Sequence, residues 1–209
     1  MTRYILNSGG LRGKPELSRE FFTEIVSGLG SCPRLLLCYF AKPRKEWEKK
    51  YSEDKKEIPK FIPKGVSPVF DLALPSKLER QLKDSVAIYI LGGDDDLIIS
   101  NLKRFNLPRI WEGKTVATNS ASSHALSRYF WSCDARTCGD GLGILPIKFL
   151  AHYNSDYGSD DSRGPINWKK AYIELKGYGN KKLPIHALEE GYFITIEISN
   201  ELFSHHKNT

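Results

Sequence analysis

Ser120 stands where a strand pattern turns directly into a helix pattern. The β-branched stretch 115–119 precedes it, and the small residues of 121–123 follow it. A residue at such a corner is held in a strained and exposed position, and the first turn of the helix offers free backbone N–H groups to an anion. These are the mechanical requirements of a nucleophilic serine, so Ser120 is the first candidate for chemistry.

A nucleophilic serine also needs a base and an acid. Its hydroxyl is a poor nucleophile unless a neighbouring base accepts the proton, and the base needs an acidic partner that fixes its tautomer. His152 ends the apolar run 149–151, a position from which its side chain can reach a crevice. A lone histidine there is more often structural. We favour the catalytic interpretation because the Ser120 corner and the Gly92-Gly93 loop accompany it.

Alternating strand and helix patterns supply the elements that would position these residues. Such alternation predicts an α/β fold with a mostly parallel sheet covered by helices on both faces. Ligands of these open sheets bind beyond the carboxyl ends of the strands, where Gly92-Gly93 and Ser120 both lie. The expected strands are 3–7, 34–41, 66–72, 86–91 and 115–119, and the expected helices are 18–29, 45–57, 76–83 and 95–105.

The C-terminal third of the chain is less regular. A polar loop at 154–164 follows His152, and a helix over 166–176 precedes a closing strand over 192–198. The tail Ser204–Thr209 is expected to fray. Because no repeat or domain boundary interrupts the pattern, we expect a single α/β domain over residues 1–209.

Composition and charge narrow the class of protein. The net charge of +6 arises largely around residues 42–56, where lysine and arginine alternate with glutamate. Such alternation is typical of a solvated helix face and, without a binding motif, argues against nucleic acid. No apolar run is long enough to span a membrane, and the N-terminus has a strand pattern instead of a signal peptide. We therefore expect a cytoplasmic protein that binds neither nucleic acid nor membrane.

Neither the cysteines nor the clustered acids suggest a metal site. The four cysteines, at 32, 38, 133 and 138, have no metal-ligand spacing. Free thiols in a reducing compartment are favoured over a Cys133–Cys138 disulfide. The acids at 94–96 open a helix, where they act more simply as cap and dipole partners than as metal ligands. We expect no metal.

Four segments, taken in order, resemble the peptidase E group of serine peptidases, which includes aspartyl dipeptidases and the related cyanophycinases. Residues 90–94 (Ile-Leu-Gly-Gly-Asp) are similar to the family's strand that ends in glycines and Asn or Asp. Residues 119–121 resemble its Gly-x-Ser-Ala-Gly-Ala elbow. Residues 142–153 resemble its Leu-Pro segment followed by His-Tyr, and 188–191 resemble its late Glu-Gly turn. Their common order is more specific than any single match.

The resemblance implies a class I glutamine amidotransferase-like fold, a flavodoxin-like three-layer sandwich. It implies that Ser120 attacks a scissile carbonyl and that His152 acts first as general base and then as general acid. The backbone N–H groups of Gly93 and Ala121 would form the oxyanion hole. The implied activity is hydrolysis of a small peptide substrate, as by a dipeptidase, with no metal or organic cofactor.

The acid of the implied triad is open between two residues. The family uses an Asp soon after the serine in some members and the later Glu in others, and Asp134 and Glu190 match these positions. We favour Glu190 because it belongs to a clear Glu-Gly match beside a strand end. Asp134 would otherwise be a loop or helix-end carboxylate, and Glu190 a turn carboxylate.

Further residues are candidates for substrate binding. Arg163 in the polar loop could bind a carboxylate through its forked donors, although a solvated arginine is the ordinary interpretation. His124, on the helix after the corner, either lines the pocket or is structural. The full set of substrate-binding candidates is Gly92, Asp94, Asn119, His124 and Arg163.

Two departures from the family pattern leave a second function open. Thr118 and Ser122 occupy elbow positions where the family has glycine, which relieves strain and allows close approach. The β-branched Thr118 could tilt Ser120 away from His152. The alternative is therefore a binding or interaction protein of the same fold with an inactive or altered elbow. The sequence does not fix the preferred peptide bond or whether the chain forms a homodimer.

Overall fold

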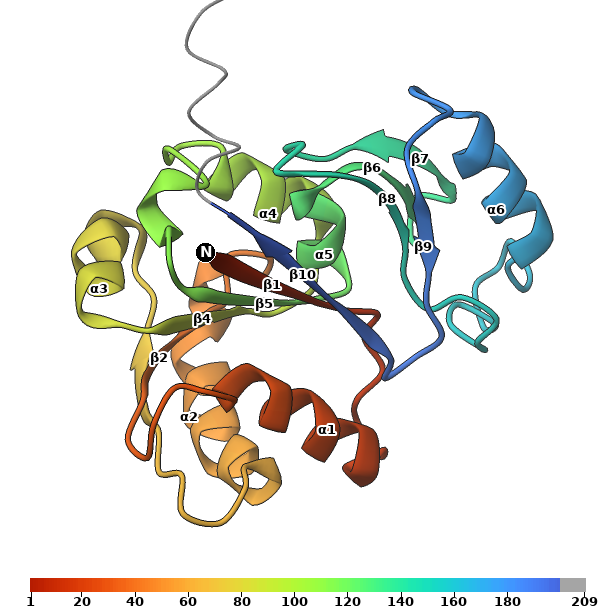
Figure 1. Cartoon of the computed structure of the whole chain (residues 1–209). Helices are drawn as coiled ribbons and strands as arrows, with labels where there is room; N and C mark the ends of the chain where they lie inside the picture. The colour runs from red at the N-terminus through yellow and green to blue at the C-terminus, as the bar shows by residue number, and fades with distance from the viewer. Residues whose placement is uncertain (200–209) are drawn as a thin grey trace, which may run out of the picture.

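The computed structural model describes residues 1–199, in which two β-sheets and their flanking helices form a layered α/β fold (Figure 1). The larger sheet has six strands in the order β10-β1-β5-β4-β2-β3. Every neighbouring pair is parallel except β10 and β1. Its strands are β1 Thr2–Asn7, β2 Arg34–Cys38, β3 Val69–Leu72, β4 Ala87–Ile90, β5 Thr115–Asn119 and β10 Phe193–Ile198.

The central strands are apolar along their length. In β2 the residues after Arg34 are Leu-Leu-Leu-Cys, and β4 reads Ala-Ile-Tyr-Ile; all of these are buried. A strand covered by helices on both faces requires such a continuous apolar run, because neither face meets water. The sequence pattern therefore predicts these strands well.

Helices cover both faces of the larger sheet. Figure 1 shows α1 and α2 on one face and α4 and α5 on the other. Helix α1 begins at Pro15 instead of Ser18, because a proline fits the first turn of a helix, where its missing N–H has no partner to lose. The helices are α1 Pro15–Val26, α2 Trp47–Glu57, α3 Leu78–Asp84, α4 Asp95–Leu102, α5 Ala121–Leu126 and α6 Trp168–Gly177.

A second sheet of four strands, in the order β7-β6-β8-β9, lies beyond α5 (Figure 1). Strands β6, β8 and β9 are parallel, and β7 is antiparallel to β6. Helix α5 contacts β6 and β8, while α6 contacts β6 and β7 from the outer side. The strands are β6 Ser127–Ser132, β7 Thr137–Asp140, β8 Leu145–Leu150 and β9 Ile185–Ala187.

The sequence does not predict β6 and β7. Helix α5 passes into β6 with no intervening turn, since Ser127 directly follows Leu126. Strand β7 contains Gly139, and a glycine inside a strand weakens the pattern by which strands are recognised. The predicted α/β architecture with mostly parallel strands is confirmed, whereas its division into two sheets is a correction to the single sheet expected.

Lys148 joins β8 to the end of α6. Its side chain is fully buried, and its Nζ donates to the carbonyls of Leu175, Lys176 and Tyr178 at 2.8, 3.0 and 2.5 Å. A cation is favourable there because the last carbonyls of a helix have no intrahelical partner. Helix α6 is thereby held against the second sheet.

Three further expectations concern the C-terminal tail, membrane-spanning helices and the state of the cysteines. The fraying expected for Ser204–Thr209 lies outside the described residues. Among residues 1–199, no helix combines the length and the apolar character needed to cross a bilayer. The four cysteines are free thiols, as the sequence favours.

Candidate active site

Ser120 occupies a tight corner between β5 and α5. Its backbone has φ 50° and ψ −113°, a conformation that residues other than glycine rarely adopt. The Ser120 N–H donates to the Asn7 carbonyl at 2.9 Å. The Ser120 carbonyl accepts from the N–H groups of Ser123 and His124 at 2.8 and 3.1 Å. The corner is fixed on both sides, and backbone strain of this kind is typical of functional residues.

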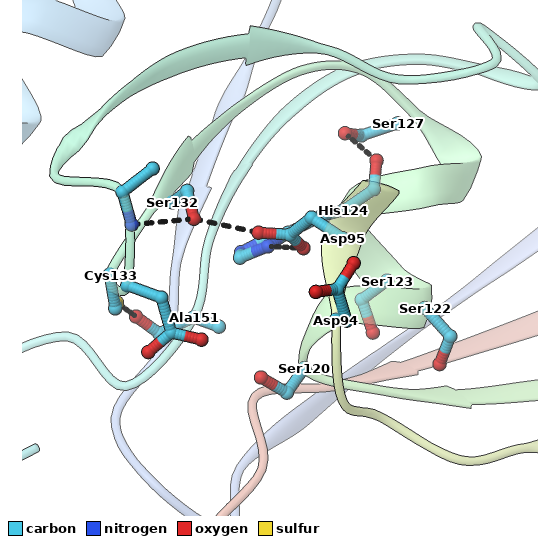
Figure 2. Close-up of polar contacts among 12 residues, drawn as sticks. Asp94, Asp95, Ser120, Ser122, Ser123, His124, Ser127, Ser132, Cys133 and Ala151 are labelled. Atoms are coloured by element: carbon cyan, nitrogen blue, oxygen red, sulfur yellow. Dashed lines mark hydrogen bonds and ion pairs between the residues drawn. The ribbon is translucent and has the colours of Figure 1, made fainter. Parts of the chain in front are cut away.

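Hydroxyl groups hold the elbow at the positions where the peptidase E pattern has glycine. The Thr118 and Ser123 hydroxyls lie 2.8 Å apart. The Ser122 hydroxyl accepts from the Asn119 N–H at 2.8 Å and donates to the Ile90 carbonyl at 2.6 Å. Both substituted side chains are fully buried. Figure 2 shows the serines of this turn close together at the start of α5. The hydroxyls of both residues that replace glycine are therefore hydrogen-bonded.

Ser120, His152 and Glu190 form a continuous chain of hydrogen bonds. The Ser120 Oγ lies 2.9 Å from His152 Nε2, and His152 Nδ1 lies 2.9 Å from Glu190 Oε1. Ser120 follows β5 and His152 follows β8. Glu190 lies between β9 and β10. Lys14 supports the carboxylate, with its Nζ 3.4 Å from Glu190 Oε2. The structure thus brings together side chains from both sheets.

Ser8 fixes the backbone of His152. The His152 N–H donates to Ser8 Oγ at 2.6 Å, and the Ser8 hydroxyl donates to the Leu188 carbonyl at 2.7 Å. His152 has φ 56°, in the left-handed region. One hydroxyl therefore connects the loop after β1 to the segments that carry His152 and Glu190.

The Gly9-Gly10 loop lies directly against the three side chains. A Cβ on Gly9 would lie 2.6 Å from His152 Cε1 and 3.2 Å from Ser120 Cβ, and a Cβ on Gly10 would lie 2.5 Å from Glu190 Cβ. Both glycines also have positive φ, 97° and 68°, which disfavours larger residues. Neither position has room for a side chain.

His152 has the protonation state that a general base requires. Burial lowers the pKa of the imidazole below its ordinary value of 6.5, although hydrogen bonding to Glu190 opposes that effect. The ring is therefore neutral at neutral pH. If Nδ1–H donates to the carboxylate, Nε2 is free to accept from the Ser120 hydroxyl. This arrangement can remove the hydroxyl proton.

Asp134, the other candidate acid, is not part of the Ser120–His152–Glu190 chain of hydrogen bonds. Its Oδ1 accepts from the Tyr157 hydroxyl at 2.9 Å. The Tyr157 ring in turn stacks on the His152 ring, with centroids 4.1 Å apart. Of the two candidate acids, Glu190 is the one that is hydrogen-bonded to His152.

The Gly92-Gly93 loop packs against the elbow. A Cβ on Gly92 would lie 2.5 Å from the Asn119 carbonyl oxygen and 3.2 Å from Ser120 Cβ. A Cβ on Gly93 would collide with the Ala41 carbonyl oxygen. On the other side of the corner Ala121 is the first residue of α5, so its N–H has no partner within the helix. Both segments expected to supply an oxyanion hole therefore adjoin the elbow.

Three of the substrate-binding candidates have structural partners. Asp94 caps α4 through its side chain, which accepts a backbone N–H at 2.7 Å. Asn119 Nδ2 donates to the Tyr89 hydroxyl at 3.0 Å. Arg163 pairs with Asp161 through its Nε at 2.9 Å, on an exposed loop. The structure brings none of the three into the hydrogen-bonded chain.

His124 is buried behind the elbow. Its Nδ1 lies 2.9 Å from Asp95 Oδ1, and Asp95 Oδ2 accepts from the Ser132 hydroxyl at 2.7 Å (Figure 2). Its ring stacks on Phe130 with centroids 4.8 Å apart, and the residue is only 3% exposed. These contacts favour the structural interpretation of His124 over the pocket-lining one.

Sequence reasoning missed Ser8, Gly9, Gly10 and Tyr157. A signal for the first three exists, because Asn-Ser-Gly-Gly directly follows the first strand pattern. Since β1 and β5 are parallel neighbours, with Asn7 paired to Asn119, this loop and Ser120 leave the sheet at the same edge. Tyr157 has no comparable signal, because its position depends on the path of an irregular loop.

The fold and the hydrogen-bonded chain together define an α/β protein with a Ser-His-Glu arrangement at the carboxyl edge of its sheet. A crystal structure of a peptidase from an acI-B1 Actinobacterium has a similar fold, with a TM-score of 0.61 and 16% sequence identity over 94% of this chain and 83% of that chain. A Listeria monocytogenes EGD-e protein assigned as a peptidase E has a TM-score of 0.59 and 17% identity, over 95% of this chain and 100% of that chain. No family model and no curated protein matches the sequence. The predicted likeness of the fold to peptidase E is thereby confirmed.

Proposed function

We propose that this protein is a serine peptidase of the peptidase E type that hydrolyses small peptides. The observation that carries the proposal is the hydrogen-bonded chain Ser120–His152–Glu190, in which both links measure 2.9 Å. The fold shared with two solved structures, one described as a peptidase and one assigned as a peptidase E, supports the same class of reaction.

Acylation begins at Ser120. Its Oγ attacks the carbonyl carbon of the scissile peptide bond while His152 Nε2 takes the hydroxyl proton. Glu190 accepts a hydrogen bond from Nδ1–H and stabilises the imidazolium that forms. The imidazolium then gives its Nε2 proton to the leaving amine, and the carbonyl carbon remains as an ester on Ser120. Water, deprotonated by the same ring, attacks the ester carbonyl, and the imidazolium returns that proton to the Ser120 oxygen as the carboxylic acid leaves.

The negative charge on the attacked carbonyl oxygen needs donors that are already in place. We assign this role to the backbone N–H groups of Gly93 and Ala121, whose segments lie on either side of the elbow. Preorganised donors of this kind stabilise the transition state without reorganising, and the loss of one costs roughly a hundredfold or more in turnover.

The proposed substrate is a peptide of dipeptide size, and the steps require neither a metal nor an organic cofactor. Every proton transfer is assigned to Ser120, His152, the leaving amine or water. A panel of dipeptides that includes N-terminal aspartate will identify the preferred N-terminal residue, and sedimentation will identify the oligomeric state.

Labelling with a fluorophosphonate probe tests the nucleophile. We expect the wild-type protein to be labelled, and Ser120→Ala and His152→Ala to lose labelling while keeping a wild-type circular dichroism spectrum. Ser31→Ala, which removes an exposed serine away from the elbow, is the control and should label normally. A folded wild-type protein that resists the probe and cleaves no dipeptide would instead favour the alternative, a non-catalytic binding protein of this fold.

A further inference from the structure

Tyr157 covers one face of the His152 imidazole. The two ring centroids lie 4.1 Å apart, and the planes meet at 27°, which is a stacked arrangement. The Tyr157 hydroxyl donates to Asp134 Oδ1 at 2.9 Å. Burial and the neighbouring carboxylate raise the pKa of this phenol, so the hydroxyl remains protonated and continues to donate. The ring is therefore anchored at its far end while it contacts the imidazole.

We propose that Tyr157 is a positioning residue for His152, and that Asp134 acts on the reaction by anchoring Tyr157. The inference rests on the proposed function, because it assigns a role to the same imidazole. The proposed role of Tyr157 is distinct from that of Glu190, because Tyr157 contacts the face of the imidazole and Glu190 contacts its edge. It also gives Asp134 a role without a hydrogen bond to His152.

The physical basis is the charge that appears on His152 during acylation. The neutral ring becomes an imidazolium only when it takes the Ser120 proton. A cation within about 6 Å of an aromatic centroid is attracted by the negative face of the ring. Because the attraction is much weaker for the neutral imidazole, it stabilises the transition state more than the ground state, which is the requirement for faster chemistry.

Anchoring strengthens the same effect. A free tyrosine side chain loses rotamer freedom when it settles on a partner, whereas a hydroxyl bound to Asp134 has already restricted its ring. The carboxylate also adds a negative charge near the imidazole. Glu190 and Asp134 favour the imidazolium and raise the pKa of His152. Burial and the nearby His124 disfavour the imidazolium and lower that pKa.

Replacement of the ring tests the stacking. We expect Tyr157→Leu to slow the phosphonylation of Ser120 by a fluorophosphonate about twofold to thirtyfold, the range that a partly buried cation–π contact allows. Tyr157→Phe keeps the ring and should recover most of the lost rate. Tyr172→Leu, which removes a half-buried tyrosine from α6, is the matched control and should label at the wild-type rate.

Comparison of the two variants distinguishes the contribution of the Tyr157 ring from that of its hydroxyl. Wild-type labelling by Tyr157→Leu would overturn the proposal. Equal losses in Tyr157→Leu and Tyr157→Phe would also overturn it, because they would assign the effect to the hydroxyl. Thermal melting of each variant accompanies the kinetics. A lower rate in Tyr157→Leu at a temperature where the variant is fully folded supports positioning over a loss of stability.

Asp134→Asn removes the charge but keeps an amide oxygen that can accept from the Tyr157 hydroxyl, whereas Asp134→Ala removes both. Anchoring therefore predicts slower labelling for Asp134→Ala than for Asp134→Asn, and equal rates would overturn it.

A titration of His152 tests the charge that Asp134 adds near the imidazole, without any substrate or probe. In Asp134→Asn the pKa of His152, followed by NMR of the imidazole, should fall, because a nearby negative charge is lost. Asp160→Asn, which removes a carboxylate as exposed as Asp134 from the loop that carries Tyr157, should leave it unchanged. An unchanged pKa in Asp134→Asn would overturn the claim that the charge of Asp134 acts on His152. Since the titration needs no catalysis, it remains decisive even if Ser120→Ala shows that the proposed function is wrong.

Discussion

At the scale of single residues, the imidazole of His152 is held by contacts from several separate segments. Ser8 fixes its backbone, Glu190 fixes Nδ1, and Tyr157 covers one face. Gly9 lies against Cε1, where there is no room for a larger residue. A general base whose ring cannot turn keeps Nε2 directed at Ser120, and small errors in such geometry are costly to the rate.

Gly9→Ala should therefore impair the reaction more than the fold. The added methyl group would lie 2.6 Å from His152 Cε1, so the imidazole must move away from Ser120. A displacement on the order of 1 Å typically costs roughly a hundredfold in rate, and we expect a loss of that size in probe labelling. Gly13→Ala is the matched control. It has a similar positive φ of 79° but no atom within 4 Å of the new Cβ, and should label normally. Equal losses in both variants would contradict the prediction by assigning the effect to backbone strain.

The dependence of acylation on pH should follow His152. Its pKa lies below the ordinary 6.5, so the rate should rise with pH through a midpoint below 6.5 and stay level at neutral pH. Glu190 raises that pKa. Glu190→Gln should therefore move the midpoint further toward acid and lower the plateau by roughly a hundredfold or more. Glu189→Gln, an exposed neighbour, should change neither. A midpoint above 6.5 in the wild type would show that burial does not dominate.

At the scale of elements, the elbow shows how a strand and a helix meet without the usual glycines. Thr118 lies within β5 and needs no unusual φ, and its hydroxyl has partners at the Ile5 carbonyl and Ser123. Ser122 contributes two further bonds. The turn is thus stabilised by side-chain hydrogen bonds in place of the freedom that glycine provides.

Thr118→Gly should accordingly destabilise the protein, although it restores the family residue. It removes buried hydrogen bonds and adds backbone freedom, so we expect a loss of about 2 kcal/mol in the free energy of unfolding, measured with denaturant. Thr137→Gly, at an exposed site in β7, should cost less. Greater stability or faster labelling in Thr118→Gly would mean that the threonine strains the elbow.

Element by element, the sequence predicts what depends on local pattern and misses what depends on pairing. Strands β2, β4 and β5 follow from apolar or β-branched runs, and Ser120 follows from the junction after β5. Strand β6 is missed because a helix passes into it without a turn. The role of Ser8 is missed because it arises only when β1 pairs with β5. The preference for Glu190 over Asp134 came from the family resemblance and not from the pattern of residues.

At the scale of the whole molecule, the candidate site joins two sheets. Ser120 leaves the larger sheet, His152 follows β8 of the second sheet, and Glu190 lies between β9 and β10, one strand from each sheet. The second sheet and α6 enclose a small apolar cluster of their own. Its buried members are Trp131, Cys133, Leu150, Ile166, Ala171 and Leu175. The placement of His152 relative to Ser120 therefore depends on how firmly this smaller cluster holds.

Leu175→Ala tests that dependence. The residue is fully buried in α6, and such a truncation typically costs about 2–5 kcal/mol. We expect hydrogen exchange to rise in β8, β9 and α6 before it rises in β1 and β5, and probe labelling to fail on heating before the larger sheet melts. Ile173→Ala, on the same helix but 58% exposed, should leave exchange and labelling within error of the wild type. Exchange that rises equally in both sheets would show that the two sheets unfold as one unit. It would contradict the prediction that probe labelling fails before the larger sheet melts.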